Sequence, residues 1–229
     1  MMDLLSTGIA GLDVLLNGGL TKGSTTLLIG PVGTLKSFIG QQFIYAGLKN
    51  GEKCLYVGTL ESQSDFEDQV KLNFGWDIKP FVKKGLLKFV DLSPFWAFES
   101  PELTKPIDLV RIAEAIFAAK KGMSGGRILV NNLSHFFNFT ADNQAAVRMI
   151  LGLRSNAKKC GATALFIMDE GAQEKHVEEN IKSICDYVLT AEIQENDRKV
   201  RVSKALTKHG LEWHRLLLTE KGVEVEVVL

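Results

Sequence analysis

The sequence lacks a surplus of either charge and has few cysteines and prolines, and each shortage excludes a class of protein. Lys+Arg and Asp+Glu both number 27. This balance argues against a non-specific nucleic-acid binder, because such proteins carry excess positive charge. The 3 cysteines show no C-x-x-C spacing, so we expect buried, reduced thiols and a cytoplasmic protein. With only 5 prolines and 45% hydrophobic residues, the chain is of an ordinary globular type.

The N-terminal residues do not follow the pattern of a signal peptide or of a membrane span. No Lys or Arg precedes the first apolar residues, and Asp3 and Asp13 interrupt them, so we predict neither a signal peptide nor a membrane span. The 229 residues contain no linker, low-complexity tract or repeat of fixed period. We therefore expect one domain over residues 1–229.

Strand patterns alternate with helical patterns through most of the chain. Strands are predicted at 24–29, 53–59, 85–92, 127–132 and 162–168. Helices are predicted at 36–51, 64–75, 106–122, 142–161 and 174–183, the second of them with Ser64 as its N-cap. This alternation predicts an α/β fold with a mostly parallel central sheet and helices on both faces. Four strand patterns without helices follow residue 184 and predict a C-terminal antiparallel β extension.

A candidate phosphate-binding loop follows the first predicted strand. Its sequence GPVGTLKS nearly matches G-x-x-x-x-G-K-[ST] and leads into a predicted helix. In such a loop, backbone N–H groups and the helix N-terminus bind phosphate, the lysine reaches the β- and γ-phosphates, and the hydroxyl ligates magnesium. We predict that the whole loop binds a nucleotide: Gly30, Pro31, Val32, Gly33, Thr34, Leu35, Lys36 and Ser37.

One residue of this loop departs from the pattern. Leu35 stands where the second fixed glycine belongs, and that glycine lets the main chain approach the phosphates without a Cβ. The leucine side chain either crowds the cradle or is tolerated because it points away. The sequence leaves both interpretations open.

The N-terminal STGIAGLDVLLNGGLTKGSTTLLIGPVGTLKS closely resembles the opening of the KaiC/RadA branch of the RecA-like ATPases. Further similarities are FGWDI at 74–78, the strand RILVNNLS at 127–134 and EWHRLLLTEKGVEV at 212–225, in the family's order. The resemblance implies a RecA-like P-loop fold with ATP or ADP as the ligand. It also implies assembly into rings or filaments in which the nucleotide lies between subunits.

The resemblance also implies catalytic positions, and this chain departs from several of them. Where the family has two glutamates, the chain has Leu60 and Glu61; Glu61 is a general base if it reaches the attacking water, and otherwise a solvated carboxylate. The family's magnesium-binding aspartate falls at Asn131. An amide carries no charge to hold the cation, so Asn131 would act only indirectly beside Ser37, and Mg²⁺ binding is expected to be weakened.

Two further positions bear on catalysis. The family's Lys-x-Arg, which reaches the phosphates of a neighbouring subunit, aligns with Lys204 and Leu206, so the arginine is absent. Lys204 or Lys208 would supply charge but not a bidentate fork. Asp169 and Glu170 end a strand that should lie beside the phosphate-loop strand, and they are either compensating metal or catalytic groups or a plain polar strand end.

Because the losses fall on hydrolysis and the binding loop is largely kept, the sequence predicts a nucleotide-binding regulatory or scaffolding protein with weak or no hydrolysis. A homo-oligomer or a family-related protein partner is expected. Two alternatives stay open: a slow Mg²⁺-dependent ATPase of DNA recombination related to RadA, and a pseudo-ATPase that binds no nucleotide and serves protein interactions. Nucleic acid stays open as a partner that the charge balance does not indicate, and no membrane is expected.

Overall fold

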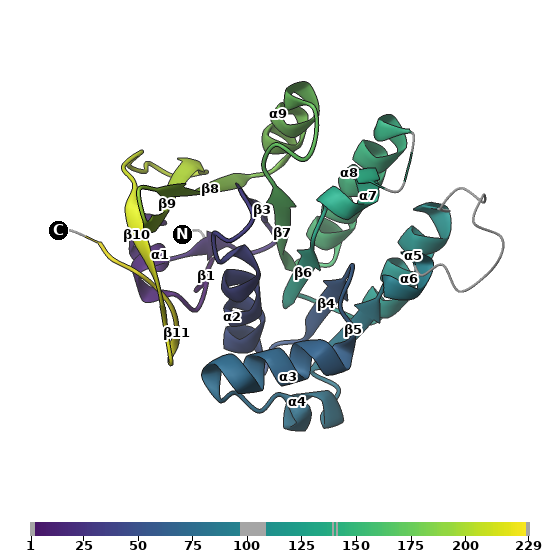
Figure 1. Cartoon of the computed structure of the whole chain (residues 1–229). Coiled ribbons are helices and arrows are strands. Elements are labelled where there is room, and N and C mark those ends of the chain that lie inside the picture. Colours follow the sequence, from purple (N-terminus) through teal and green to yellow (C-terminus); the bar gives the residue numbers. More distant parts are fainter. Residues whose placement is uncertain (1–2, 97–108, 139, 141, 228–229) are drawn as a thin grey trace.

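A single large sheet organises the molecule. The computed structural model describes residues 3–96, 109–138, 140 and 142–227, and in this part of the chain nine strands form one sheet in the order β11-β10-β9-β8-β3-β7-β6-β4-β5 (Figure 1). These strands are β3 (Thr25–Gly30), β4 (Cys54–Gly58), β5 (Leu87–Asp91), β6 (Arg127–Asn131), β7 (Thr163–Asp169), β8 (Tyr187–Gln194), β9 (Asp197–Lys204), β10 (His214–Thr219) and β11 (Gly222–Val225).

The sheet is parallel from β5 to β8 and antiparallel beyond it. The pairs β5–β4, β4–β6, β6–β7, β7–β3 and β3–β8 are parallel, whereas β8–β9, β9–β10 and β10–β11 are antiparallel. The turn between β8 and β9 includes Glu195 at φ 57°. The predicted fold class, with its antiparallel extension, is confirmed.

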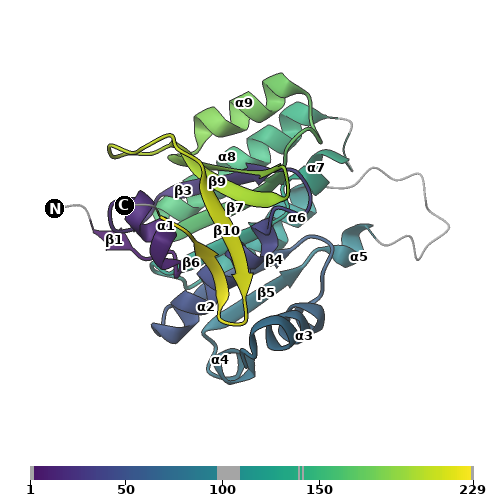
Figure 2. The ribbon, with the colours of Figure 1, turned by 60° about the vertical axis from the view of Figure 1, so that its left-hand side comes forward.

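Helices cover both faces of the sheet (Figures 1 and 2). One face carries α1 (Ala10–Leu15), α2 (Lys36–Lys49), α3 (Gln63–Phe74) and α4 (Lys79–Lys83). The other carries α6 (Leu109–Lys120), α7 (Ser134–Asn138), α8 (Asn143–Lys159) and α9 (Lys175–Ile184), and α5 (Ser93–Trp96) follows the edge strand β5.

One hydrophobic core therefore lies on each face of the sheet, and alternate residues of each strand contribute side chains to one core or the other. Leu28 of β3 packs into the core with Phe43 of α2, whereas its neighbour Leu27 packs into the core with Ile150 of α8. Because successive side chains of a strand point to opposite faces, an apolar run such as that of β3 fills both cores. This is the pattern expected for a parallel strand buried on both faces.

The structure corrects some predicted details. Helix α3 is capped by Ser62, not Ser64: the Ser62 hydroxyl accepts from the Asp65 N–H at 3.2 Å, and the Asp65 carboxylate accepts from the Ser62 N–H at 3.0 Å. Both serines have an acid three residues later, Asp65 for Ser62 and Glu67 for Ser64, but only the Ser62–Asp65 pair forms the reciprocal capping box. Cys160 is half-buried, although Cys54 and Cys185 are buried as expected and burial raises the pKa of each of these two thiols to about 12.

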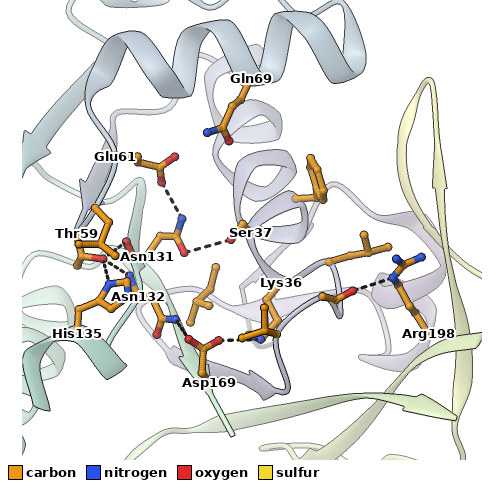
Figure 3. A pocket seen from close by; sticks show the side chains of 16 residues that line it. Lys36, Ser37, Thr59, Glu61, Gln69, Asn131, Asn132, His135, Asp169 and Arg198 are labelled. Atoms are coloured by element: carbon orange, nitrogen blue, oxygen red, sulfur yellow. Dashed lines mark hydrogen bonds and ion pairs between the residues drawn. The ribbon is translucent and has the colours of Figure 1, made fainter. Parts of the chain in front are cut away.

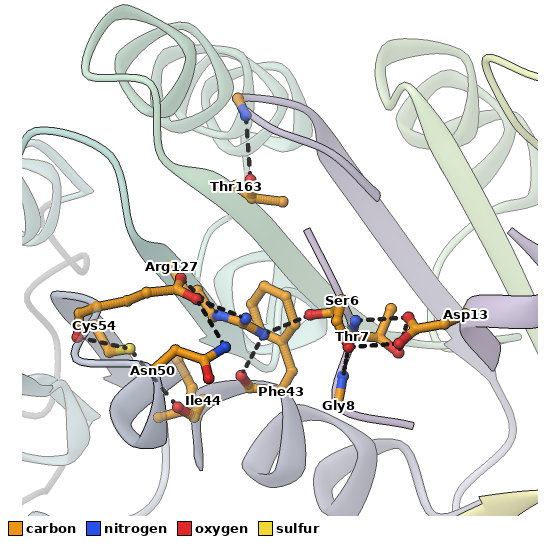
Figure 4. Close-up of polar contacts among 12 residues, drawn as sticks. Ser6, Thr7, Gly8, Asp13, Phe43, Ile44, Asn50, Cys54, Arg127 and Thr163 are labelled. Atoms are coloured by element: carbon orange, nitrogen blue, oxygen red, sulfur yellow. Dashed lines mark hydrogen bonds and ion pairs between the residues drawn. The ribbon is translucent and has the colours of Figure 1, made fainter. Parts of the chain in front are cut away.

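The N-terminal segment is fastened to the sheet by polar contacts (Figure 4). It forms β1 (Leu4–Leu5), α1 and β2 (Leu20–Thr21), with β1 and β2 paired antiparallel. Within it, the Asp13 carboxylate accepts from the backbone N–H and the hydroxyl of Thr7, each at 2.7 Å. The family-like run of Ser, Thr, Gly and Asp thus closes a loop that lies beside α2.

Arg127 ties this segment to the rest of the chain. Its guanidinium is fully buried at the start of β6 and donates to both carboxylate oxygens of Glu52, at 2.9 and 3.0 Å. It also donates to the carbonyl oxygens of Ser6 and Phe43, each at 2.9 Å, and it lies over the Phe43 ring (Figure 4). Such a buried charge is tolerated because its donors are satisfied.

We predict that Glu52→Ala lowers the free energy of unfolding by about 3–5 kcal/mol, because it leaves the Arg127 charge buried without its partner. Urea unfolding followed by circular dichroism measures this loss. The matched control is Glu179→Ala, which removes a carboxylate that pairs with Lys182 at the surface at 2.8 Å and should cost at most about 1 kcal/mol. Equal losses in the two variants would contradict the role given to Arg127.

Candidate functional site

The carboxyl ends of the central parallel strands meet at one edge of the sheet and form a pocket of about 530 Å³ (Figure 3). The register sets Gly30 of β3 opposite Asp169 of β7, and Gly58 of β4 opposite Asn131 of β6. The residues that line the pocket are Val32, Gly33, Leu35, Lys36, Ser37, Phe38, Thr59, Leu60, Glu61, Gln69, Asn131, Asn132, His135, Ile167, Asp169 and Arg198. The predicted loop and the predicted acids at other strand ends therefore come together here.

The phosphate loop has the backbone that its sequence pattern requires. Gly33 has φ 91°, a conformation that favours glycine. Gly30 is required for a different reason: a Cβ there would lie 2.2 Å from the carbonyl oxygen of Ala191 in β8. The first N–H groups of α2 point out of the helix end without an intrahelical acceptor, which is the arrangement that binds phosphate. Thr34 is fully buried and its hydroxyl donates to the Pro31 carbonyl at 2.8 Å, so these two residues shape the loop.

Leu35 takes a backbone conformation that favours glycine. It is the N-cap residue of α2 with φ 65° and ψ 15°, in the left-handed region. Its side chain is 8% exposed and packs into the same core as Ile39 and Phe43, although it also contributes to the wall of the pocket. The core therefore accommodates most of the side chain. The cost of the leucine lies in its left-handed backbone conformation, which is unfavourable for a residue with a Cβ.

Lys36 is turned inward to partners within the chain (Figure 3). Its ammonium donates to the carbonyl oxygens of Gly30 and Pro31, each at 2.7 Å, and lies 3.1 Å from the Asp169 carboxylate. Burial lowers the pKa of Lys36, and the hydrogen bond and charge of Asp169 oppose that shift. Asp169 is held in turn by the Asn132 amide, which donates to its other oxygen at 2.6 Å.

A second series of polar contacts runs across the strand ends. The Ser37 hydroxyl donates to the side-chain oxygen Oδ1 of Asn131 at 3.4 Å, and the Asn131 side-chain nitrogen donates to Glu61 at 2.7 Å (Figure 3). The buried Tyr56 hydroxyl also donates to Glu61. Burial raises the pKa of Glu61, and the hydrogen bonds from Tyr56 and Asn131 oppose the rise. Glu61 is therefore a largely enclosed carboxyl group at the pocket, not a solvated strand-end carboxylate.

Sequence reasoning missed several residues of the pocket. Thr59 donates to the Asn131 carbonyl at 2.7 Å and contacts the ring nitrogen of His135, and burial lowers the pKa of that histidine. Arg198 of β9 donates to the Gly33 carbonyl at 2.8 Å, so the antiparallel extension reaches the phosphate loop. No pattern in the sequence marks Arg198, because its position depends on the pairing of β9 with β8.

Other predicted residues lie elsewhere. Glu170 is exposed and is not among the residues that line the pocket. The Lys204 ammonium donates to the carbonyl oxygens of Lys182, Ser183 and Cys185 at the end of α9, at 3.3, 2.9 and 2.6 Å. Within one subunit this lysine therefore caps a helix. Leu206 and Lys208 are exposed outside the pocket.

Comparison with known proteins identifies the family. The family described as "ATPase: KaiC" matches residues 5–227, nearly the whole chain. The chain belongs to the KaiC ATPase family. A UPF0273 protein of Pyrococcus horikoshii is 28% identical, over 96% of this chain and 93% of its own length. The circadian clock protein KaiC3 of Synechocystis is 24% identical over 98% of this chain, which spans 46% of that protein.

A solved structure supports the same fold. The crystal structure of a KaiC-like protein from Pyrococcus horikoshii superposes with a TM-score of 0.78 at 23% sequence identity, covering 99% of this chain and 100% of that one. The predicted membership of the KaiC/RecA superfamily is confirmed. Among the described residues, no helix combines the length and hydropathy of a membrane-spanning segment.

The residues of the pocket suit the phosphate groups of a magnesium–nucleotide complex better than they suit its Mg²⁺ ion. Lys36, the glycine conformation at Gly33 and the start of α2 suit the phosphates. The two positions that the family resemblance gives to the cation, Ser37 and Asn131, offer only neutral oxygens, whereas Mg²⁺ sites usually include carboxylate. The carboxylates that line the pocket, Glu61 and Asp169, are hydrogen-bonded to the amides of Asn131 and Asn132. The described residues contain no group of three or more His, Cys, Asp and Glu side chains placed to hold a metal ion.

We predict that Leu35→Gly is more stable than Leu35→Ala by about 1 kcal/mol, because both lose the buried leucine but only glycine relieves the left-handed backbone. Both should be less stable than the parent chain, since a buried leucine contributes about 2–5 kcal/mol. Urea unfolding of the three proteins gives the order. The prediction is wrong if alanine is the more stable substitution, as it is in ordinary helix positions.

We predict a pH dependence from Glu61. Its native pKa lies above the usual 4.5, so the native state holds this proton more tightly than the unfolded chain, and stability falls as pH rises through that interval. Glu61→Gln keeps an oxygen acceptor for Tyr56 and removes the titration. Unfolding free energies measured from pH 4.5 to neutrality should therefore decline less in the variant, and parallel curves for the two proteins would contradict the assignment.

Proposed function

We propose that this KaiC-family chain binds ATP or ADP at Gly30–Ser37 and uses nucleotide occupancy to regulate its assembly or its grip on a protein partner, with weak or no hydrolysis. One observation supports it above the others: Asn131, where the family has a magnesium-binding aspartate, lies between Ser37 and Glu61 and bonds to both. The loop that binds phosphate is kept, whereas the group that should hold the cation is neutral.

The same contact bears on the general base. A base must accept a proton from the attacking water with a free lone pair. Glu61 already accepts from Tyr56 and from the Asn131 amide, and an aspartate at 131 would have no N–H to donate. Both of these donors meet the same oxygen, Oε1. The change from acid to amide therefore weakens the cation site and also places a donor against one of the two oxygens of the carboxylate that would activate water.

Binding depends on different groups from hydrolysis. Backbone N–H groups of the loop and the start of α2, with Lys36, suffice to hold phosphates. A ligand that favours one assembly state over another then shifts the population between them. The proposal includes a cytoplasmic homo-oligomer in which each chain forms one domain. It also includes the residues of the loop as the nucleotide-binding site.

Slow Mg²⁺-dependent hydrolysis is the second candidate, because Glu61 does lie at the pocket with its pKa raised by burial. A pocket closed to nucleotide is the third candidate, because Leu35 forms part of its wall.

Calorimetric titration with ATP, with and without Mg²⁺, distinguishes these functions when phosphate release is followed in the same samples. Binding that is lost in Lys36→Ala, with little release, supports a regulatory binder. Rapid Mg²⁺-dependent release shows an enzyme, and binding seen only in Leu35→Gly shows a closed site.

We predict that Asn131→Asp increases the factor by which Mg²⁺ strengthens ATP binding, by about tenfold, because it supplies the missing anionic ligand. Calorimetry with and without Mg²⁺ measures this factor for each protein. Asn143→Asp, which adds the same charge at the start of α8 outside the pocket, is the control and should leave it unchanged. An unaltered factor in Asn131→Asp would mean that residue 131 does not face the cation.

A further inference from the structure

The charges around Lys36 are balanced before any ligand enters. The charged side chains that line the pocket are Lys36, Arg198, Glu61 and Asp169. Arg198 lies at the loop, where its guanidinium donates to Gly33. Of the two carboxyl groups, only Asp169 pairs with the Lys36 ammonium, whereas Glu61 is hydrogen-bonded to Tyr56 and Asn131 (Figure 3).

That ammonium group has no donor to spare. A lysine has three N–H donors, and Lys36 directs them to the Gly30 carbonyl, the Pro31 carbonyl and the Asp169 carboxylate. A phosphate group that binds Lys36 must take over one of these places. The only anion among these three partners is the Asp169 carboxylate, with which a phosphate would compete for the ammonium.

Asp169 is held in place and cannot easily give way. Its Oδ2 accepts from Asn132 at 2.6 Å, and its backbone N–H donates to the Ser134 hydroxyl at 3.0 Å. It also ends β7 in register with Gly30. A phosphate oxygen that shares the Lys36 ammonium would therefore lie within about 6 Å of this carboxylate, and in a partly buried pocket such repulsion is only weakly screened.

We propose that Asp169 makes this site selective for nucleoside diphosphates over triphosphates, an inference that rests on the proposed nucleotide-binding function. The backbone cradle serves a diphosphate and a triphosphate alike, but a third phosphate adds negative charge on the side where Lys36 pairs with Asp169. Asn131 brings no charge there to hold a compensating cation. The site thus favours the ligand with fewer charges.

The test is calorimetric titration with ADP and with ATP in buffer that contains EDTA, so that no divalent cation masks the effect. The parent chain should bind ADP about tenfold more tightly than ATP. Asp169→Asn, which is nearly isosteric and releases Lys36, should strengthen ATP binding more than ADP binding and reduce that ratio to near unity. Glu174→Gln removes an exposed carboxylate from the loop before α9 and should keep the parent ratio.

Failure of this inference can be distinguished from failure of the proposed function. Equal affinities of the parent chain for ADP and ATP overturn the selectivity and leave nucleotide binding intact, and the parent measurement does not depend on any variant folding. A ratio in Asp169→Asn that equals the parent ratio shows that another group selects and also overturns the assignment. Binding of neither nucleotide by the parent chain overturns both proposals.

Discussion

The register between β3 and its parallel neighbours is the constraint on which the site depends. These strands are covered on both faces, so their backbone groups can be satisfied only by one another. A shift of one residue would turn every side chain of a strand toward the opposite core. With this register, the carboxyl ends of β3, β7, β6 and β4 meet at one edge. The phosphate loop, Asp169, Asn131 and Glu61 become neighbours for that reason, although they are far apart in the sequence.

At that edge, partial burial forces polar groups to find partners within the chain. Lys36 is 5% exposed, and its partners are two loop carbonyls and a carboxylate. The Asn131 amide donates to Glu61, and the Asn132 amide donates to Asp169. Two chains of contacts result, one through Lys36 and one through Ser37. An anion that binds Lys36 must replace one of the partners of Lys36. A cation that binds Ser37 and Asn131 must disrupt the hydrogen bond between them.

Phosphate binding and hydrolysis rest on physically different parts of this edge. The cradle is made of main-chain N–H groups, which persist whatever the neighbouring side chains are. In the function that we propose, cation binding and water activation depend on individual side chains at the ends of other strands, and the amide at 131 would affect both. A member of the KaiC family can therefore keep the first property while the second declines.

The sequence alone determined the α/β class, the parallel order implied by alternating elements, the C-terminal strands and the phosphate loop, because periodicity and local glycine spacing carry these features. It did not show that Ser62 rather than Ser64 caps α3, since each serine has an acid three residues later, Asp65 or Glu67, and both match the capping-box pattern. Nor did it show that Leu35 adopts a left-handed backbone conformation while its side chain packs into the core. Only the tertiary structure decided the partners of Lys36, Glu61 and Arg198. Those partners come from strands distant in sequence, and the sheet register, not any local pattern, selects them.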